Sequence, residues 1–266
     1  MDNLLFVRLI ISQEDEKMYI DSHCHITCDD LYNRKEEVIQ NMQELSGAMI
    51  MCTNQEELLR ALPIKEKDAR FKIAWGWFPG DAKEISENHY QILQAAIDAN
   101  QIDCLGEIGL DYHWDDTFKD TQKEVFIRQI EMANQANLPI SIHMRDATKD
   151  CLSILKEHAK TKIIFHCFSG SLEILRQCLE MDSFISLAGP VTFKNARKAV
   201  NIAKECPLDR LLTETDSPYM CPEPFRGHQN EPMYVQYVAK KIAELKGMDL
   251  AEVCKQIETN YASIFA

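Results

Sequence analysis

The sequence predicts an α/β fold in which eight parallel strands and their connecting helices close into a single (β/α)8 TIM barrel. From residue 19 onward, short apolar segments rich in β-formers alternate with longer amphipathic segments, and this alternation predicts a parallel sheet with helical crossovers. The length of 266 residues fits one barrel of about 250 residues. The alternative is an open doubly wound sheet, which usually has a glycine-rich phosphate loop after its first strand. Here the first strand runs into His-Cys-His-Ile-Thr.

Eight segments are predicted to be the strands of this barrel. In chain order they are YIDSHC from Tyr19, AMIMC from Ala48, KIAWGW from Lys72, DCLGEIG from Asp103, PISIH from Pro139, KIIFH from Lys162, FISLAG from Phe184 and RLLTET from Arg210. Their nearly continuous apolar character is typical of strands that are buried on both faces. The segments between them show helical periodicity, as from Lys119 to Asn137, where Val125, Phe126, Ile130 and Ala133 share one side.

We predict one barrel domain at residues 19–266, preceded by an N-terminal extension at residues 1–18. The extension has only a short apolar segment, interrupted by Arg8, and it lacks the features of a signal peptide. It is either an additional, disordered arm or the result of an upstream start, with Met18 as the true first residue. The proline-rich segment from Pro218 to Pro232 follows the eighth strand, so we expect a long loop over the C-terminal ends of the strands.

The charge balance limits the kinds of partner that the surface can bind. The formal net charge is −13, from 29 basic and 42 acidic residues. Passive coating of a nucleic acid would need a broad basic surface, and this composition argues against one. It remains compatible with a nuclease, because bound divalent cations reverse the local sign of an acidic site.

The ten cysteines are scattered through apolar segments, for example at Cys52, Cys104, Cys178 and Cys254. This pattern is typical of reduced core cysteines, so we predict a cytoplasmic protein without disulfides. No apolar segment approaches the roughly 18–20 residues needed to cross a bilayer. The sequence therefore predicts no membrane partner.

Residue types that bind metal ions stand at the ends of five of the eight predicted strands. The C-terminal ends of barrel strands converge on one pocket, so residues far apart in the sequence are expected to meet there. The candidate ligands are His23 and His25 on the first strand, Glu107 on the fourth, His143 on the fifth, His166 on the sixth and Asp216 after the eighth. Each alone has an ordinary alternative, a core histidine or a buried ion pair, but together they are hard to explain by packing.

Strand alternation adds detail to the first strand. His23 and His25 are two residues apart and therefore face the same side, while Cys24 faces the helices. Asp21 is expected on the same side as the histidines, where its carboxylate can orient an imidazole.

The other strand ends predict a second metal ion. The two carboxylate oxygens of Glu107 can bridge two cations about 3.5–4 Å apart, and His143 and His166 form the second ion's imidazole pair. Asp216 can bind the first ion and take a proton from a water molecule. We therefore expect Asp216 and Glu107 to be the catalytic residues, with Glu214 as a further ligand or as a partner of one.

Arg145 shares its side of the fifth strand with His143. Its guanidinium can either clamp a phosphate or neutralise the nearby carboxylates. Both interpretations stay open at the level of sequence.

The segments that carry these residues resemble the signature segments of the TatD family of metal-dependent DNases. They are YIDSHCH, GEIGLDYHW, ISIHMRDA, IIFHCFSG and LLTETDSPYM, followed by RGHQNEP. The resemblance extends from about Tyr19 to the end of the chain. It implies a TIM barrel with two divalent metal ions, one held by His23, His25, Glu107 and Asp216 and the other by Glu107, His143 and His166. It also implies that Arg226 and Asn230 contact substrate or shape the pocket.

One segment departs from the family pattern. The family usually shows Gly-x-His-Pro-His after the third strand, whereas this chain has Phe78 and Gly80 at the two histidine positions. Neither position belongs to the predicted ligand set, so the departure bears on the substrate and not on metal binding.

The leading functional hypothesis is a metal-dependent deoxyribonuclease that uses a metal-activated water in a two-metal mechanism. The resemblance suggests trimming from the 3′ end, and the predicted substrate is single-stranded DNA or a frayed end. Tyr112, Trp114 and Trp77 are candidates for stacking on bases. Mg²⁺ or Mn²⁺ is the expected cofactor, with Zn²⁺ as an alternative.

Two other classes of function compete with this hypothesis. Amidohydrolases that cleave small esters, amides or lactones use the same barrel, but many of them carry a carbamylated lysine on the fourth strand, where this chain has Glu107. A non-catalytic binding protein is the third class, and the complete ligand set argues against it.

Overall fold

The computed structural model describes residues 18–266, so residues 1–17 of the predicted extension lie outside the described part of the chain. Eight strands alternate with helices along it, in the order that the sequence predicts. The strands are β1 (Tyr19–Cys24), β2 (Leu45–Cys52), β3 (Phe71–Trp75), β4 (Leu105–Asp111), β5 (Ile140–Arg145), β6 (Ile163–Phe165), β7 (Phe184–Leu187) and β8 (Leu211–Thr213).

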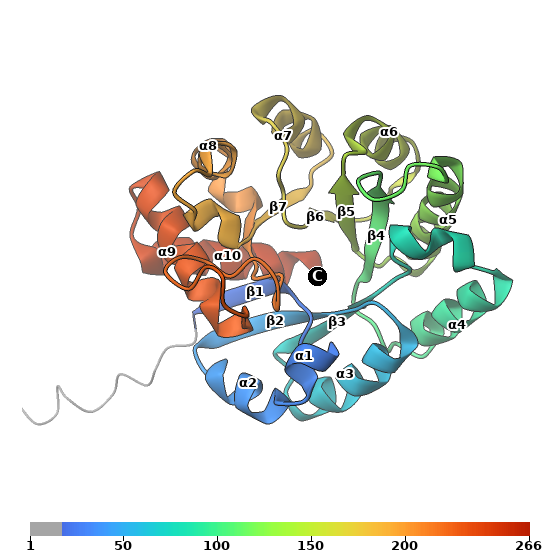
Figure 1. Cartoon of the computed structure of the whole chain (residues 1–266), viewed down its shortest axis with the longest axis horizontal. Coiled ribbons are helices and arrows are strands. Elements are labelled where there is room, and N and C mark those ends of the chain that lie inside the picture. The colour runs from blue at the N-terminus through green and yellow to red at the C-terminus, as the bar shows by residue number, and fades with distance from the viewer. Residues whose placement is uncertain (1–17) are drawn as a thin grey trace, which may run out of the picture.

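Helices connect the strands and form the outer layer (Figure 1). The α-helices are α1 (Asp29–Tyr32), α2 (Lys35–Asn41), α3 (Gln55–Lys67), α4 (Glu87–Asp98), α5 (Lys119–Ala136), α6 (Thr148–His158), α7 (Leu172–Leu179), α8 (Arg197–Glu205), α9 (Val235–Lys246) and α10 (Leu250–Ile264). Short 3₁₀ turns complete the connections: η2 (Pro79–Glu84), η3 (Gly189–Thr192), η4 (Leu208–Arg210) and η5 (Pro232–Tyr234).

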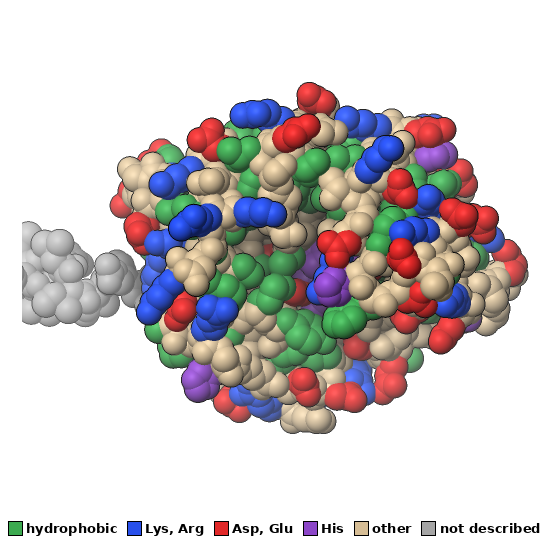
Figure 2. Space-filling model, turned by 45° about the horizontal axis from the view of Figure 1, so that its top comes forward, with side chains coloured by type: hydrophobic (Ala, Val, Ile, Leu, Met, Phe, Trp, Pro, Cys, Tyr) green, Lys and Arg blue, Asp and Glu red, His purple; other side chains and the backbone are tan. Residues whose placement is uncertain are grey.

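All strand pairs are parallel, and the sheet closes on itself. β1, β2 and β3 form one continuous run and β4 to β8 form another. Single parallel bridges join the two runs, from Ala74 to Cys104 at one junction and from Cys24 to Ser217 at the other. The predicted single-domain TIM barrel is therefore confirmed. Figure 2 shows a hollow near the middle of one face, in which acidic and histidine side chains are visible.

Two strands slip in register by one residue. On β1, Asp21 pairs with Ala48 but Cys24 pairs with Ile50, so three steps on β1 face two steps on β2. On β4, Leu105 pairs with Ile140 and Ile108 with Ile142, which repeats the same mismatch. An extra residue of this kind kinks a strand and changes the direction of its side chains. Both irregularities lie in segments that carry predicted metal ligands.

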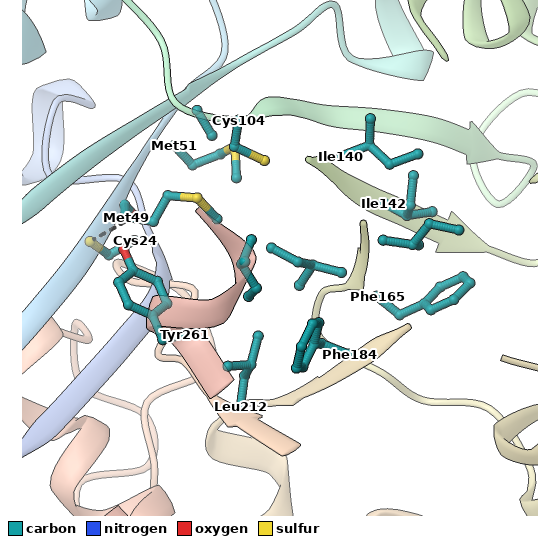
Figure 3. Packing of buried hydrophobic residues seen from close by; sticks show 14 of the residues in the cluster. Cys24, Met49, Met51, Cys104, Ile140, Ile142, Phe165, Phe184, Leu212 and Tyr261 are labelled. Atoms are coloured by element: carbon teal, nitrogen blue, oxygen red, sulfur yellow. Dashed lines mark hydrogen bonds between the residues drawn. The ribbon is translucent and has the colours of Figure 1, made fainter. Parts of the chain in front are cut away.

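Apolar side chains from the strands and from α10 fill the core, including the labelled residues of Figure 3: Met49, Met51, Ile140, Ile142, Phe165, Phe184, Leu212 and Tyr261. All ten cysteines are free, as the sequence predicts. Cys24 is fully buried, and its thiol donates a hydrogen bond to the carbonyl of Met49 at 3.4 Å. Sulfhydryls in this setting behave as small apolar side chains.

Among residues 18–266, no helix is both long enough and apolar enough to span a membrane.

Candidate metal centre

The six predicted ligands come together at the C-terminal ends of the strands. Their donor atoms form three overlapping groups in which all atoms lie within 4.8 Å of one another: His23, His25 and Glu107; His23, His166 and Asp216; and Glu107, His143 and His166. Five strand ends, separated by up to 193 residues of sequence, therefore supply one compact cluster.

One half of the cluster belongs to β1 and the segment after β8. The Nε2 atoms of His23 and His25 lie 3.2 Å apart. Asp216 Oδ1 is 3.6 Å from the first and 3.4 Å from the second. Glu107 Oε2 lies 3.9 Å from His23 Nε2. Four donors from three chain segments thus surround one small volume.

The other half belongs to β4, β5 and the end of β6. Glu107 Oε1 is 2.5 Å from both His143 Nδ1 and His166 Nε2, and these two nitrogens lie 3.3 Å apart. The two oxygens of Glu107 therefore face different halves of the cluster. This arrangement is what a carboxylate that bridges two cations requires.

The chemistry of this donor set suits metal ions better than protons alone. In each half, two imidazole nitrogens face each other at 3.2–3.3 Å, and one proton at most can lie between them. Carboxylate oxygens add only acceptors, and the ring atom Nδ1 of His23 is buried without a hydrogen-bond partner. Imidazole and carboxylate donors together are the usual ligands of Zn²⁺ and Mn²⁺, and carboxylates also bind Mg²⁺.

The charged members of the cluster shift one another's pKa values. Burial opposes a charge on His166, but the Glu107 carboxylate reverses this effect and raises the imidazole pKa well above its usual value. Burial likewise acts to raise the pKa of Glu107, but His166 and His143 lower it well below its usual value. The pKa of His23 is lowered by burial and by His166. Metal ions would replace the protons that balance Glu107, so binding should release protons.

Unusual backbone conformations place several of these groups. Asp216 has a φ of +54°, and its amide donates to the carbonyl of His23 at 2.9 Å. Cys167, directly after His166, has a φ of +41°. Residues other than glycine with positive φ cluster at functional sites, where the surrounding structure holds them. Gly109 has a φ of +145°, and a Cβ at this position would lie 2.0 Å from the carbonyl oxygen of His143.

Asp111 belongs to the site although the sequence argument did not single it out. It ends β4, is buried, and accepts hydrogen bonds from His143 Nε2 at 3.0 Å and from the amide of His113 at 2.8 Å. Burial opposes its charge, but the bond to His143 prevails and lowers the pKa of Asp111. Because Asp111 binds the Nε2 side of the His143 ring, the Nδ1 atom on the other side stays available to a cation. Asp111 lies four residues after Glu107. Side chains an even number of residues apart share one side of a strand, so this spacing could have identified Asp111 from the sequence.

Glu214 lies next to His166, one of the predicted ligands. Its Oε1 lies 3.6 Å from His166 Nδ1 and accepts the amide hydrogen of Cys167 at 2.6 Å. Burial raises the pKa of this carboxyl group. The prediction of a supporting role next to a ligand therefore agrees with the geometry.

The expected role of Asp21 is wrong. Its carboxylate accepts hydrogen bonds from the hydroxyl of Thr215 at 2.6 Å and from the amide of Thr215 at 2.9 Å, and so it connects β1 to the end of β8. The register shift after Asp21 breaks the simple alternation on which the expectation rested. Asp21 stabilises the closure of the barrel and does not orient an imidazole.

The residues predicted to meet the substrate divide into two groups. Arg145 and Arg226 are exposed, and neither forms an ion pair within residues 18–266. The guanidinium of Arg145 lies 5.2 Å from the ring centre of Trp114. That of Arg226 lies 4.2 Å from the ring centre of Phe193. Both remain available to a phosphate. Burial opposes the charge of Asp111, but the bond to His143 and the charge of Arg145 lower the pKa of that carboxyl group, so Arg145 also offsets a nearby carboxylate.

Asn230, in contrast, is fully buried, and the expectation of a substrate contact is not supported. Its amide group donates to the carbonyls of Thr215 at 2.9 Å and Tyr219 at 2.6 Å, and its oxygen accepts from the amide of Glu231 at 3.0 Å. These bonds use its polar atoms to fix the loop after β8. The alternative role that the resemblance implied, shaping the pocket, fits this geometry.

The aromatic candidates also differ in availability. Trp114 is 79% exposed. Trp77 is buried and its indole N–H donates to the carbonyl of His89 at 3.2 Å, so it is not free to stack on a base. Tyr112 is half-buried and donates to Asp150 at 2.9 Å. Tyr219 was not predicted, yet it is 58% exposed and its ring centre lies 6.1 Å from that of His25.

Phe78, one of the two departures from the family pattern, touches the centre. Its ring packs edge-on against His143, with 4.9 Å between ring centres. Gly80 leaves room for it, because a Cβ there would lie 3.0 Å from the Phe78 ring.

A cavity of about 750 Å³ elsewhere in the molecule is lined by Asn137, Lys160 and Met181, among others, and holds none of the predicted ligands.

A buried cluster of imidazoles and carboxylates at the C-terminal ends of a TIM barrel defines the class of metal-dependent barrel hydrolases. Within this class, the chain belongs to the TatD related DNase family, whose model matches residues 20–266. It is 42% identical to the metal-dependent hydrolase YabD of Bacillus subtilis (strain 168), over 93% of this chain and 99% of that protein. It is 32% identical to the metal-dependent hydrolase YcfH of Escherichia coli (strain K12), over 92% and 95% of the two chains.

Solved structures agree with this assignment. The crystal structure of YJJV, a TatD homologue from Escherichia coli K12, superposes with a TM-score of 0.87 at 27% identity and covers 94% of this chain and 98% of that one. A TatD family hydrolase from Entamoeba histolytica, at 21% identity, shares the fold with a TM-score of 0.83 over 94% of this chain and 98% of its own. The protein is a metal-dependent hydrolase.

Proposed function

We propose that this hydrolase cleaves phosphodiester bonds of DNA and removes nucleotides from the 3′ end of a single strand or a frayed terminus. The observation that carries the proposal is the position of Glu107, whose Oε2 faces His23 while its Oε1 faces His143 and His166. These residues would hold two cations, which would supply stabilisation of the attacking and leaving oxygens when a phosphodiester is hydrolysed. Family membership supports DNA as the substrate class.

The residues around the cluster have distinct tasks in this proposal. His23 and His25 orient Asp216 Oδ1, which lies 3.6 and 3.4 Å from their nitrogens, so that it can take a proton from the attacking water. Asp111 and Glu214 hold the rings of His143 and His166. Arg145 is free to bind a phosphate oxygen, and Trp114 beside it offers an exposed face to a base.

The shape of the mouth favours ends over the middle of a strand. The loop from Ser217 to Pro232 covers part of the C-terminal face, and Asn230 fixes it from below. A stiff duplex does not enter a barrel mouth, whereas a single-stranded end does. Exposed Trp114 and Tyr219 come from loops after β4 and β8 and can stack on bases without distinguishing their sequence.

The test compares end-labelled linear single-stranded DNA with a closed single-stranded circle. Protein dialysed against chelator is assayed with Mg²⁺, Mn²⁺ or Zn²⁺ added back, and products are resolved at single-nucleotide length. We expect no cleavage without metal and stepwise shortening from the 3′ end when metal is restored. If the closed circle were cleaved as fast as the linear strand, the enzyme would be an endonuclease and not an exonuclease. Full activity in excess chelator would contradict the two-metal proposal. A parallel assay on a lactone and an aryl ester tests the amidohydrolase alternative.

A further inference from the structure

Four cations lie in the segment after β7 with the first turn of α8 and in the loop after β8. We propose that they bind the phosphate backbone of a single-stranded nucleic acid leading to the metal centre. This surface, the cationic patch, consists of Lys194, Arg197, Lys198 and Arg226. The inference rests on the proposed function, because it gives the substrate strand a second contact surface beyond the reacting phosphate.

The local charge of the patch is opposite to that of the chain. The net charge is −13, yet residues 189–203 contain three basic residues, Lys194, Arg197 and Lys198, and no acidic one. Lys194, Arg197 and Lys198 are all exposed, as is Arg226. Figure 2 shows Lys and Arg side chains gathered on the left of the central hollow, toward α8 and α9, and more Asp and Glu side chains on the right.

These cations lack the carboxylate partners that many others have. Elsewhere on the surface Arg60, Lys65 and Arg128 pair with Asp29, Asp103 and Glu87. None of the four patch residues forms an ion pair with any carboxylate in the described part of the chain. No existing ion pair has to be broken before these side chains bind a polyanion, so the cost of rearrangement on binding is small.

The two loops form one unit on the same face as the metal centre. Both follow strands at their C-terminal ends, where barrel active sites lie. The guanidinium of Arg226 sits 4.2 Å from the ring centre of Phe193, and the amide of Glu223 donates to the hydroxyl of Thr192 at 2.9 Å. A Cβ at Gly189 would lie 1.9 Å from the carbonyl oxygen of Met220, so the loops are in direct contact.

An apolar surface joins the patch to the metal centre. Met220 is 36% exposed and its sulfur lies 3.8 Å from that of Cys167, the neighbour of His166. Tyr219 next to it is 58% exposed and faces the ring of His25. A strand crossing this surface would place phosphates on the cations and bases on Tyr219. This combination of charge and aromatic surface fits a nucleic acid better than an acidic peptide.

The experiment measures binding and not cleavage, so its result is independent of whether the protein is a DNase. The triple variant K194Q/R197Q/K198Q is compared with wild type for binding a fluorescent single-stranded oligonucleotide of about 20 nucleotides, with phosphorothioate linkages that resist hydrolysis. The control variant K67Q/K160Q/K204Q removes three exposed cations from the C-terminal ends of α3 and α8 and from the segment after α6, at the opposite end of the barrel. It changes the net charge by the same amount.

We expect the patch variant to bind about 10- to 100-fold more weakly at 0.1 M salt, with a salt dependence shallower by about two in the slope of log K against log salt. The control should stay within about twofold of wild type, and thermal melts should show that both variants are folded. Equal weakening in both variants, or none in the patch variant, would overturn the proposal. So would tighter binding of fluorescent poly-glutamate than of the oligonucleotide. If wild-type protein binds DNA through the patch but cleaves none, the proposed function fails while the patch stands.

Discussion

Replacing Asp111 by asparagine should weaken metal binding in one half of the centre and leave the other half intact. Asp111 Oδ2 accepts the Nε2 hydrogen of His143 at 3.0 Å, and this bond directs the Nδ1 lone pair of the ring toward Glu107 Oε1, 2.5 Å away. The amide of asparagine has nearly the same shape but carries no charge. The ring of His143 therefore loses both the fixed orientation and the electrostatic support that make it a good ligand.

The expected size of the effect follows from this single contact. Losing a hydrogen-bonded partner of a metal-ligating histidine typically costs 10- to 100-fold in metal affinity, which corresponds to about 1.4–2.7 kcal/mol. Titration of metal-free protein with Mn²⁺ or Zn²⁺ should resolve two binding events in wild type. In Asp111→Asn, the event assigned to Glu107, His143 and His166 should weaken, and the event assigned to His23, His25 and Asp216 should not.

Asp146→Asn is the matched control. Like Asp111, Asp146 lies at the C-terminal end of a strand, directly after β5, but its carboxylate is 65% exposed and contacts His113 at 2.8 Å and none of the six predicted ligands. The control should bind both ions like wild type. The reasoning would be refuted if Asp111→Asn kept both affinities within about twofold of wild type, or if both events weakened equally while the melting temperature stayed the same.

Three further predictions concern the same region. Glu107→Gln should lower the content of both ions, because each half loses a ligand oxygen, whereas His143→Ala should deplete mainly one; elemental analysis showing equal losses in the two variants would contradict the bridging role. Phe78→His should change turnover on DNA and keep the metal content, since a ring still packs against His143. Phe78→Ala should also lower the metal occupancy of the half that contains His143. Unchanged turnover for Phe78→His would show that this position does not meet the substrate. Gly109→Ala should lower the free energy of unfolding by more than about 1 kcal/mol, because a Cβ would lie 2.0 Å from the carbonyl oxygen of His143 and the φ of +145° is strained for alanine. Denaturant unfolding measures this loss, and a variant with the same unfolding midpoint as wild type would disprove the prediction.

The barrel itself could be predicted because it depends on patterns that repeat along the chain. Apolar strands and amphipathic helices alternate, and the predicted helix from Lys119 to Asn137 corresponds to α5 (Lys119–Ala136). The convergence of the six ligands also followed from the sequence, since closure of the barrel brings the C-terminal strand ends together regardless of their separation in the chain.

Predictions that depended on the direction of a single side chain were less secure. Asp21 was expected to face the imidazoles and instead bonds to Thr215. Trp77 and Asn230 were expected near the substrate and are buried with their polar groups engaged. Alternation along an ideal strand cannot show a one-residue slip, and residue type does not show which side of a loop faces solvent.

The sequence by itself determined the fold class, the family and the set of donors, because these depend on residue types and on spacings that any barrel would bring together. Only the tertiary structure decided which oxygen of Glu107 faces which donors, that Asp111 supports His143, and that the cations after β7 and β8 form one surface. These features depend on register shifts in β1 and β4 and on contacts between loops far apart in the chain. Such contacts depend on packing in three dimensions, and no local pattern in the sequence encodes them.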